Sequence, residues 1–144
     1  HWILSKTEGF HLTSPDTGVR KATAKYLCDL AQFCSDLGGD VMIFGSPKQR
    51  NLLEGVSMEQ GMTWAAEVLK ETMPTMDKLG ITIALEPLGP KETNFLCYAA
   101  DTVELAEKVA QRMIGNCGLD ATLAAAHAGA ASGGRHSSRK SPNQ

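Results

Sequence analysis

The chain has 144 residues, of which 42% are hydrophobic and 21% are charged. These fractions are typical of one globular domain that can bury a core. The formal net charge of −2 excludes the basic surface that nucleic acid or an anionic membrane would require. The apolar runs are far shorter than a membrane span and no signal segment opens the chain, so we expect a cytoplasmic protein.

The cysteines show no pattern of a disulfide framework or a metal site. Cys28 and Cys34 lie within one amphipathic helical pattern, and neither Cys97 nor Cys117 is part of a CxxC pair. Small thiols in such a pattern are usually buried and reduced. The sequence therefore predicts four reduced cysteines, without a disulfide or a zinc knuckle.

The first predicted elements are the end of a strand and a long helix. Residues 1–4, HWIL, are interpreted as the end of a strand already under way, so we expect a fragment or a processed piece. A polar loop follows and ends at Asp16, a good N-cap. Apolar residues at helical spacing from Thr17 to Leu37 predict an amphipathic helix, which Gly38 and Gly39 end.

The next elements are a short strand and a second helix. Val41–Phe44 is wholly apolar and predicts a buried strand. After a polar loop, Ser57 and Gln60 form a capping box, and the helical pattern continues to Leu79 with a Met-rich face that we interpret as core. Pro74 is expected to kink this helix or to end its regular part early.

A glutamate follows the third predicted strand. Residues 81–85 form a β-branched apolar run after a glycine, as in a strand buried on both faces, and Glu86 is the first charge after it. Side chains at the carboxyl ends of parallel strands point into the loop crevice, so Glu86 is expected to face a site. The sequence leaves open the alternative that Glu86 meets only solvent or an arginine.

The last part of the pattern is one helix and a tail. Asp101, with Glu104 as its partner, is predicted to cap a third helix. Helices that alternate with short buried strands predict an α/β fold with a parallel sheet. Residues 1–117 are taken as this domain, and residues 118–144, rich in Ala, Gly and Ser, as a disordered tail in which His127 and His136 are solvated. The pattern stops where another strand was due, as in a truncated or frame-shifted chain.

Motifs for several classes of enzyme are absent. The segment GSPKQRN lacks the GxxxxGK[ST] pattern of a phosphate loop, although an anion-binding role for Lys48 and Arg50 remains an alternative to a solvated loop. GxSxG, HExxH and GxGxxG do not occur, which leaves serine hydrolases, zinc proteases and dinucleotide-binding enzymes without support.

Polar side chains at the strand ends form the remaining candidate site. They are His1 and Trp2 after the first strand, the KQRN group after the second, and Glu86 and Asn94 after the third. In a barrel or an open α/β sheet they would share the carboxyl end, where active sites are built. A carboxylate there suits Mg²⁺ or Mn²⁺, but one carboxylate is too few for a site.

Several of these stretches resemble a known family. HWIL, HLTSPD, VMIFGSPKQRN and LEPLGPKETNFL are similar to the sugar isomerase/epimerase branch of the xylose isomerase-like TIM barrels. The resemblance covers about residues 1–117. It implies a partial (β/α)8 barrel with roughly strands 3 to 5 and their helices, namely residues 1–4, Val41–Phe44 and Ile81–Glu86.

The resemblance also implies a chemistry. Glu86 matches the first metal-binding carboxylate of the family, and the metal would be Mn²⁺, Mg²⁺ or Co²⁺. The substrate would be a sugar or sugar phosphate, isomerised or epimerised by proton transfer through an enediolate, with Glu86 as metal ligand and as acid/base. His1, Lys48, Arg50 and Asn94 are carried over as substrate contacts.

The chain departs from the family in its last part. Asp120 would be a remnant of the second ligand, and no later ligand His or Glu follows it in a matching pattern. We therefore expect an inactive fragment of an enzyme. The alternative is a non-catalytic half-barrel that binds a partner or a sugar, or forms a homo-oligomer through its open sheet edges. Action on abasic DNA is disfavoured by the acidic balance and the lack of a multi-histidine zinc set.

Overall fold

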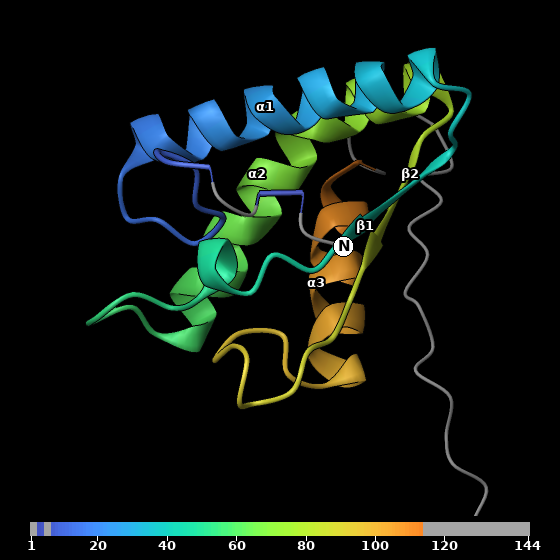
Figure 1. Cartoon of the computed structure of the whole chain (residues 1–144). Coiled ribbons are helices and arrows are strands. Elements are labelled where there is room, and N and C mark those ends of the chain that lie inside the picture. Colours follow the sequence, from blue (N-terminus) through green and yellow to red (C-terminus); the bar gives the residue numbers. More distant parts are fainter. Residues whose placement is uncertain (1–2, 5–6, 114–144) are drawn as a thin grey trace, which may run out of the picture.

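The computed structural model describes residues 3–4 and 7–113 of the chain, and for residues 111–113 it describes the backbone only. The described part forms an α/β unit in which helices alternate with two short strands (Figure 1). The elements in chain order are α1 (Thr17–Asp36), β1 (Val41–Phe44), the 3₁₀ helix η1 (Lys48–Arg50), α2 (Met58–Leu79), β2 (Thr82–Leu85) and α3 (Ala99–Met113). The predicted tail and its boundary at residue 117 lie outside the described residues.

The first two helices begin at the predicted caps. The Asp16 carboxylate accepts hydrogen bonds from the N–H groups of Gly18 and Val19, at 2.6 and 3.3 Å. Ser57 and Gln60 form a complete capping box, in which each side chain accepts from the other residue's N–H, at 3.2 and 3.1 Å. Each cap satisfies N–H groups that have no partner within the helix, and so fixes its first residue.

Of the two effects expected of Pro74, a kink or an early end of the regular helix, the early end does not occur. α2 continues through Pro74 to Leu79 and closes at Gly80, which has a left-handed backbone with φ of 66°. Met73 and Met76, on either side of the proline, are buried in the core. Packing of this face holds the helix together although Pro74 cannot donate to the hydrogen-bond ladder.

The predicted cap of the third helix is shifted by one turn. α3 begins at Ala99, so Asp101 lies inside its first turn instead of before it. The Asp101 carboxylate accepts from the N–H of Tyr98 at 3.2 Å. Asp101 therefore takes the place of the third residue in a capping box, whose side chain reaches back to the N-cap.

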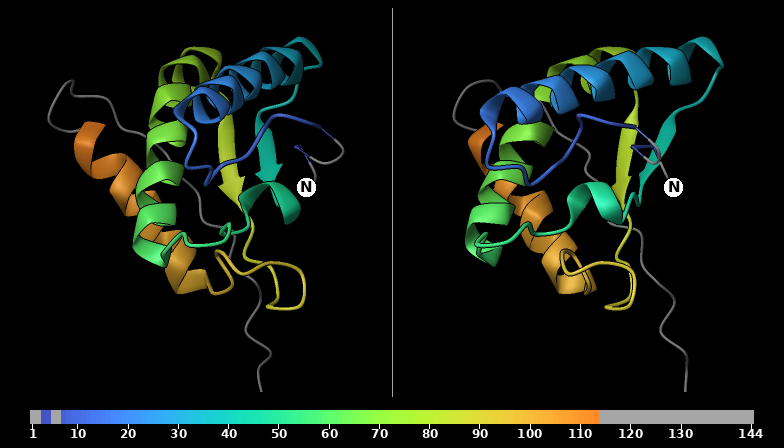
Figure 2. Two further views of the ribbon diagram at one scale, coloured as in Figure 1. Left: turned by 90° about the vertical axis from the view of Figure 1, so that its left-hand side faces the viewer. Right: turned by 60° about the vertical axis from the view of Figure 1, so that its left-hand side comes forward.

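The two strands pair in parallel, with α2 as the crossover between them. Val41 lies opposite Thr82, and Phe44 lies opposite Leu85. Figure 2 shows both strands side by side and pointing to the same end of the molecule. The prediction of a parallel sheet with a helical connection is confirmed.

One face of β1 is open, which differs from the expected burial on both sides. Met42 and Phe44 are buried, whereas Val41 and Ile43 are 51% and 46% exposed. Alternate residues of a strand point to opposite faces, so the helices cover only the face of Met42 and Phe44. An apolar run alone does not distinguish a strand covered on one face from one covered on both.

The opening residues were expected to end a strand, and their described part does not. Ile3 and Leu4 form a turn, and the N–H of Leu4 donates to the Ser46 hydroxyl at 2.9 Å. Leu4 is fully buried. The segment is thus tied to the end of β1 by a side chain and by apolar packing. His1 and Trp2 lie outside the described residues.

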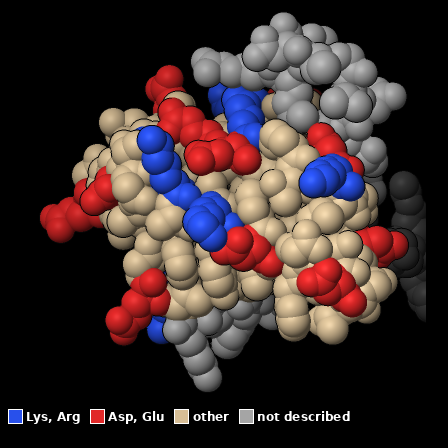
Figure 3. Space-filling view, turned by 90° about the horizontal axis from the view of Figure 1, so that it is seen from above, with Lys and Arg blue, Asp and Glu red and all other residues tan. Residues whose placement is uncertain are grey.

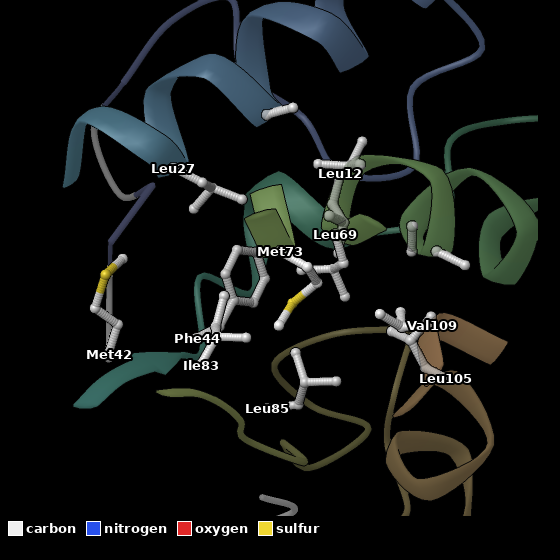
Figure 4. Packing of buried hydrophobic residues seen from close by; sticks show 14 of the residues in the cluster. Leu12, Leu27, Met42, Phe44, Leu69, Met73, Ile83, Leu85, Leu105 and Val109 are labelled. Atoms are coloured by element: carbon white, nitrogen blue, oxygen red, sulfur yellow. The ribbon is translucent and has the colours of Figure 1, made fainter. Parts of the chain in front are cut away.

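The core lies between the sheet and the helices. α1 packs across α2, and α2 packs against α3 (Figure 1). Side chains from all of these elements meet in one cluster (Figure 4), which includes Leu27, Phe44, Leu69, Met73, Ile83, Leu85, Leu105 and Val109. The Met-rich face of α2 belongs to this cluster, so its interpretation as core is confirmed.

The outer surface on the α1 side carries charges of both signs. Figure 3 shows acidic and basic side chains next to one another on this face. Lys25 and Asp29 pair at 2.7 Å along α1, and Arg20 binds Glu67 of α2 at 3.3 Å. In the part of the chain that the structure describes, no helix has the length and apolar character to cross a bilayer.

Candidate functional site at the carboxyl ends of the strands

Three loops meet at the end of the sheet where both strands finish. They are residues 7–16 before α1, residues 45–57 after β1 and residues 86–98 after β2. The Leu12 N–H donates to the Gln49 carbonyl at 2.7 Å, and the Thr13 hydroxyl donates to the Asn51 carbonyl at 2.7 Å. Figure 2 shows η1 and the loop after β2 at this end of the strands.

Glu86 stands directly after β2, at the carboxyl end of the sheet. Its N–H donates to the Phe44 carbonyl at 3.0 Å, which continues the pairing of the strands by one step. Its carbonyl accepts from the Arg50 guanidinium at 2.7 Å. The residue is half-buried. The backbone of Glu86 is therefore held on both sides at the position where the sequence predicted a site.

Arg50 is buried, contrary to the expectation that it contacts a substrate from the loop surface. Its exposed fraction is 0%. The guanidinium donates to the carbonyls of Glu86 and Leu96, at 2.7 and 3.4 Å. Its Nε has no hydrogen-bond partner among the described residues. The two carbonyls draw this side chain inward, because they need donors where the loop after β2 turns away from the sheet.

Burial lowers the pKa of Arg50 to about 10, although the nearby Cys97, Glu86 and Glu92 act in the opposite direction. The guanidinium is therefore still positively charged at neutral pH. A charged donor forms stronger hydrogen bonds to carbonyls than a neutral one does. Arg50 thus provides a buried positive charge next to the loop after β2, which carries the carboxylates of Glu86 and Glu92.

Asn94 joins the loops after β1 and β2. Its side-chain amide donates to the Leu52 carbonyl at 3.1 Å and accepts from the Leu52 N–H at 2.7 Å. The Asn51 side chain completes the connection, because its oxygen accepts from the Thr93 hydroxyl at 2.8 Å and from the Asn94 N–H at 3.2 Å. The structure therefore gives Asn94 a visible role in holding the loops together.

The remaining predicted site residues are Lys48, which the structure describes, and His1 and Asp120, which it does not. Lys48 lies in η1 with an exposed side chain, on the loop after β1. His1 and Asp120 lie outside the described residues. Glu86, Arg50 and Asn94 are thus brought together at the end of the sheet, and Lys48 lies on a neighbouring turn.

Two titratable residues near these loops were not singled out from the sequence. His11 is half-buried, with its ring 3.4 Å from the Thr13 hydroxyl, and burial lowers the pKa of His11 in spite of its hydrogen bond to the Lys48 backbone. Glu92 accepts from the Gly89 N–H at 3.3 Å within the loop after β2. The sequence signal that could have identified them is their position inside the HLTSPD and EPLGPKETNFL stretches.

The carboxylate donors at this site are of the type that a hard cation prefers. The described residues do not bring enough of them together for a complete metal site. Carboxylate oxygens, such as those of Glu86 and Glu92 on the loop after β2, suit Mg²⁺ or Mn²⁺, although Glu92 already accepts from the Gly89 N–H. Within the described ranges, no three His, Cys, Asp or Glu side chains come together as a metal site. Further ligands would therefore have to come from outside these residues.

Comparison with solved structures gives similar proteins, three of which are named as sugar 3-epimerases. A D-psicose 3-epimerase from Clostridium cellulolyticum H10, solved with D-tagatose, aligns with a TM-score of 0.60 and 19% identity over 69% of this chain and 35% of its own. A D-allulose 3-epimerase from Methylomonas sp. aligns with a TM-score of 0.63 and 16% identity, over 72% of this chain and 36% of its own.

A D-psicose 3-epimerase in the presence of D-fructose gives a TM-score of 0.62 and 18% identity, and the alignment covers 72% of this chain and 36% of that protein. At this identity the likeness shows the fold. The chain spans about a third of the length of these proteins.

The family comparison covers most of the sequence. The model described as the xylose isomerase-like TIM barrel matches residues 2–134. A search of curated proteins gives no match. The parallel sheet, its helical crossover and the strand-end loops agree with part of such a barrel. The chain therefore belongs to the xylose isomerase-like TIM barrel family.

Proposed function

We propose that the chain is part of a divalent-metal-dependent isomerase or epimerase of sugars or sugar phosphates, in which Glu86 binds the metal and transfers a proton. The observation that carries this proposal is the position of Glu86, which follows β2 where three loops meet. Membership of the barrel family supports the site, because active sites of such barrels lie at the carboxyl ends of the strands. Three neighbours are named as 3-epimerases, and two of these are described with D-tagatose or D-fructose, which supports a keto sugar as substrate.

The proposed chemistry is the removal of a proton from a carbon beside the sugar carbonyl and the return of a proton to the same or the neighbouring carbon. The Glu86 carboxylate takes a proton from the carbon beside the carbonyl, and the sugar becomes an enediolate. Return of the proton to the other carbon, together with transfer of the hydroxyl proton to the former carbonyl oxygen, completes an isomerisation. An epimerisation needs a second acid on the opposite face of the sugar, which donates a proton to the same carbon while Glu86 keeps the first one. A divalent cation would polarise the sugar carbonyl and stabilise the negative charge that develops on its oxygen.

The remaining residues have supporting roles in this proposal. Lys48, exposed on η1, and Asn94, on the facing loop, are proposed to contact the sugar hydroxyls. His1 is proposed as a further contact. Because the described residues do not assemble a full set of metal ligands, we expect weak metal binding and no turnover from these residues alone.

Isothermal titration with Mn²⁺ tests the role of Glu86. We expect micromolar binding by the chain and loss of this binding in Glu86→Gln, because the neutral amide is a much poorer ligand than the carboxylate. Glu54→Gln is the matched control, since Glu54 is exposed on the loop after β1 and the substitution changes the charge equally. Equal affinity in wild type and Glu86→Gln would refute the proposal.

A non-catalytic half-barrel that associates with itself or with a partner is the second candidate. The exposed Val41 and Ile43 on the sheet favour it, because apolar strand faces are usually covered. In this case the loops would keep at most a sugar-binding role, and Mn²⁺ would not bind at Glu86.

A further inference from the structure

Arg50 is the residue whose position the proposed chemistry does not use. Its side chain is completely buried and spans two points of the loop after β2, the carbonyls of Glu86 and Leu96. These carbonyls lie at the beginning and the end of the loop segment 86–96. A single guanidinium thus connects both ends of the segment to η1, on the neighbouring strand connection.

A backbone hydrogen bond also closes the segment 86–96, and its last residue has a strained backbone. The Leu88 N–H donates to the Leu96 carbonyl at 3.3 Å, so this oxygen accepts from both Leu88 and Arg50. Leu96 has a left-handed backbone, with φ of 57°. A non-glycine residue in this conformation is strained and persists only where its surroundings hold it.

We propose that Arg50 is a positioning residue, which aims the Glu86 carboxylate toward the metal by holding the Glu86 carbonyl and closing the 86–96 loop. This inference rests on the proposed function. The 2.7 Å bond fixes the peptide plane that follows Glu86, and the Phe44 carbonyl fixes the one that precedes it. With both planes fixed, the direction of the Glu86 side chain from the backbone is set. A buried guanidinium that is already bonded to two carbonyls is not available to bind sugar.

The Mn²⁺ affinity of Arg50 variants tests this role. We expect about a 10- to 100-fold loss of affinity in Arg50→Met, the usual effect of removing a group that orients a metal ligand. The Mn²⁺ affinity of Arg50→Lys should fall nearly as much, because an ammonium lacks the planar fork of donors with which a guanidinium reaches both carbonyls. In Arg50→Ala, added ethylguanidinium should restore part of the affinity, and ethylammonium should not.

Thr72→Ala is the control for a general loss of stability. Thr72 is buried in α2 and donates to the Leu69 carbonyl at 2.7 Å, away from the strand-end loops. We expect its Mn²⁺ affinity to stay within about twofold of wild type. The inference is overturned if Arg50→Met keeps wild-type affinity, or if Thr72→Ala loses as much as Arg50→Met.

Amide hydrogen exchange separates this inference from the proposed function, because it needs no metal. In Arg50→Met the amides of Glu86 and Leu88 should exchange faster, while that of Thr82, bonded to the Asp40 carbonyl at the other end of β2, should not change. If the wild-type chain binds no Mn²⁺, the proposed function fails. If amide exchange at Glu86 and Leu88 is the same in Arg50→Met as in wild type, the positioning role of Arg50 fails as well. If Arg50→Met does not fold, amide exchange at Glu86 and Leu88 is compared between Arg50→Lys and wild type instead.

Discussion

The side chains of Asn51 and Asn94 connect the loops that follow β1 and β2. Asn94 pairs with both backbone groups of Leu52, and Asn51 accepts from Thr93 and from the Asn94 backbone. Amide side chains can imitate backbone pairing because each carries a donor and an acceptor. Residues that follow neighbouring strands are thereby fixed relative to one another, as a binding site requires.

We expect His11 to make the stability of the chain depend on pH. Burial lowers the pKa of His11 in the folded chain below its ordinary 6.5, so the unfolded chain takes up a proton first as the pH falls. The contribution of His11 to the free energy of unfolding should therefore be complete well above pH 6.5 and should decrease as the pH falls through this value. Urea unfolding at pH 7.5 and 5.5 measures this decrease.

His11→Asn is the variant for comparison, since it keeps a polar side chain and removes the titration. We expect its free energy of unfolding to change less than that of wild type between the two pH values. The same change in both proteins would show that other groups cause the pH dependence.

Arg50 shows which part of the site the sequence could not predict. Glu86 was singled out because it is the first charge after an apolar strand. Arg50 stands in a polar loop, where an arginine is ordinarily exposed. Its burial depends on carbonyls 36 and 46 residues further along the chain, and a local pattern contains no information about such distant partners.

The helices and strands follow from local signals wherever one signal dominates. The caps at Asp16 and Ser57 were predicted because their side chains bond to the next turn. Two influences compete at Pro74, where the helix does not end early, and at Asp101, where the predicted cap lies inside the first turn. Core packing outweighs the missing hydrogen bond of Pro74, and Asp101 serves as well in the first turn as before it.

The capping box at Ser57 gives a prediction for α2. Ser57→Ala should lower the free energy of unfolding by about 1 kcal/mol, because the N–H of Gln60 loses its acceptor. Thr63→Ala is the control, since the exposed Thr63 bonds only to the Glu59 carbonyl within the same helix. It should change the stability by less than about 0.5 kcal/mol.

Urea unfolding followed by circular dichroism measures both variants. An equal loss in Ser57→Ala and Thr63→Ala would mean that the capping box does not determine where α2 begins.

The described unit exposes one side of β1. Val41 and Ile43 are 51% and 46% exposed on β1, and burial of apolar surface of this kind favours association by about 25 cal/mol per Å². We expect the chain to self-associate and Ile43→Lys to weaken this association. Sedimentation velocity over a range of concentrations measures it.

Val103→Lys, at a position 41% exposed on α3, is the matched control and should leave the association unchanged. A monomeric wild type, or equal effects of the two substitutions, would exclude association through the sheet.

The barrel family was predictable from sequence stretches that lie at the strand ends, and the partial α/β barrel is confirmed. The arrangement of the first strand was not predictable. HWIL has the composition of a strand, yet Ile3 and Leu4 form a turn held by Ser46. Composition describes the preference of a short segment, while pairing with a neighbour decides whether the segment becomes a strand.

The parallel pairing of β1 and β2 also bears on how fast the chain folds. Every residue pair in the sheet, such as Val41 with Thr82, is separated in the chain by the whole of α2. Closing so long a stretch costs conformational entropy before any strand contact rewards it. We therefore expect helix formation to precede strand pairing, and the pairing step to set the refolding rate.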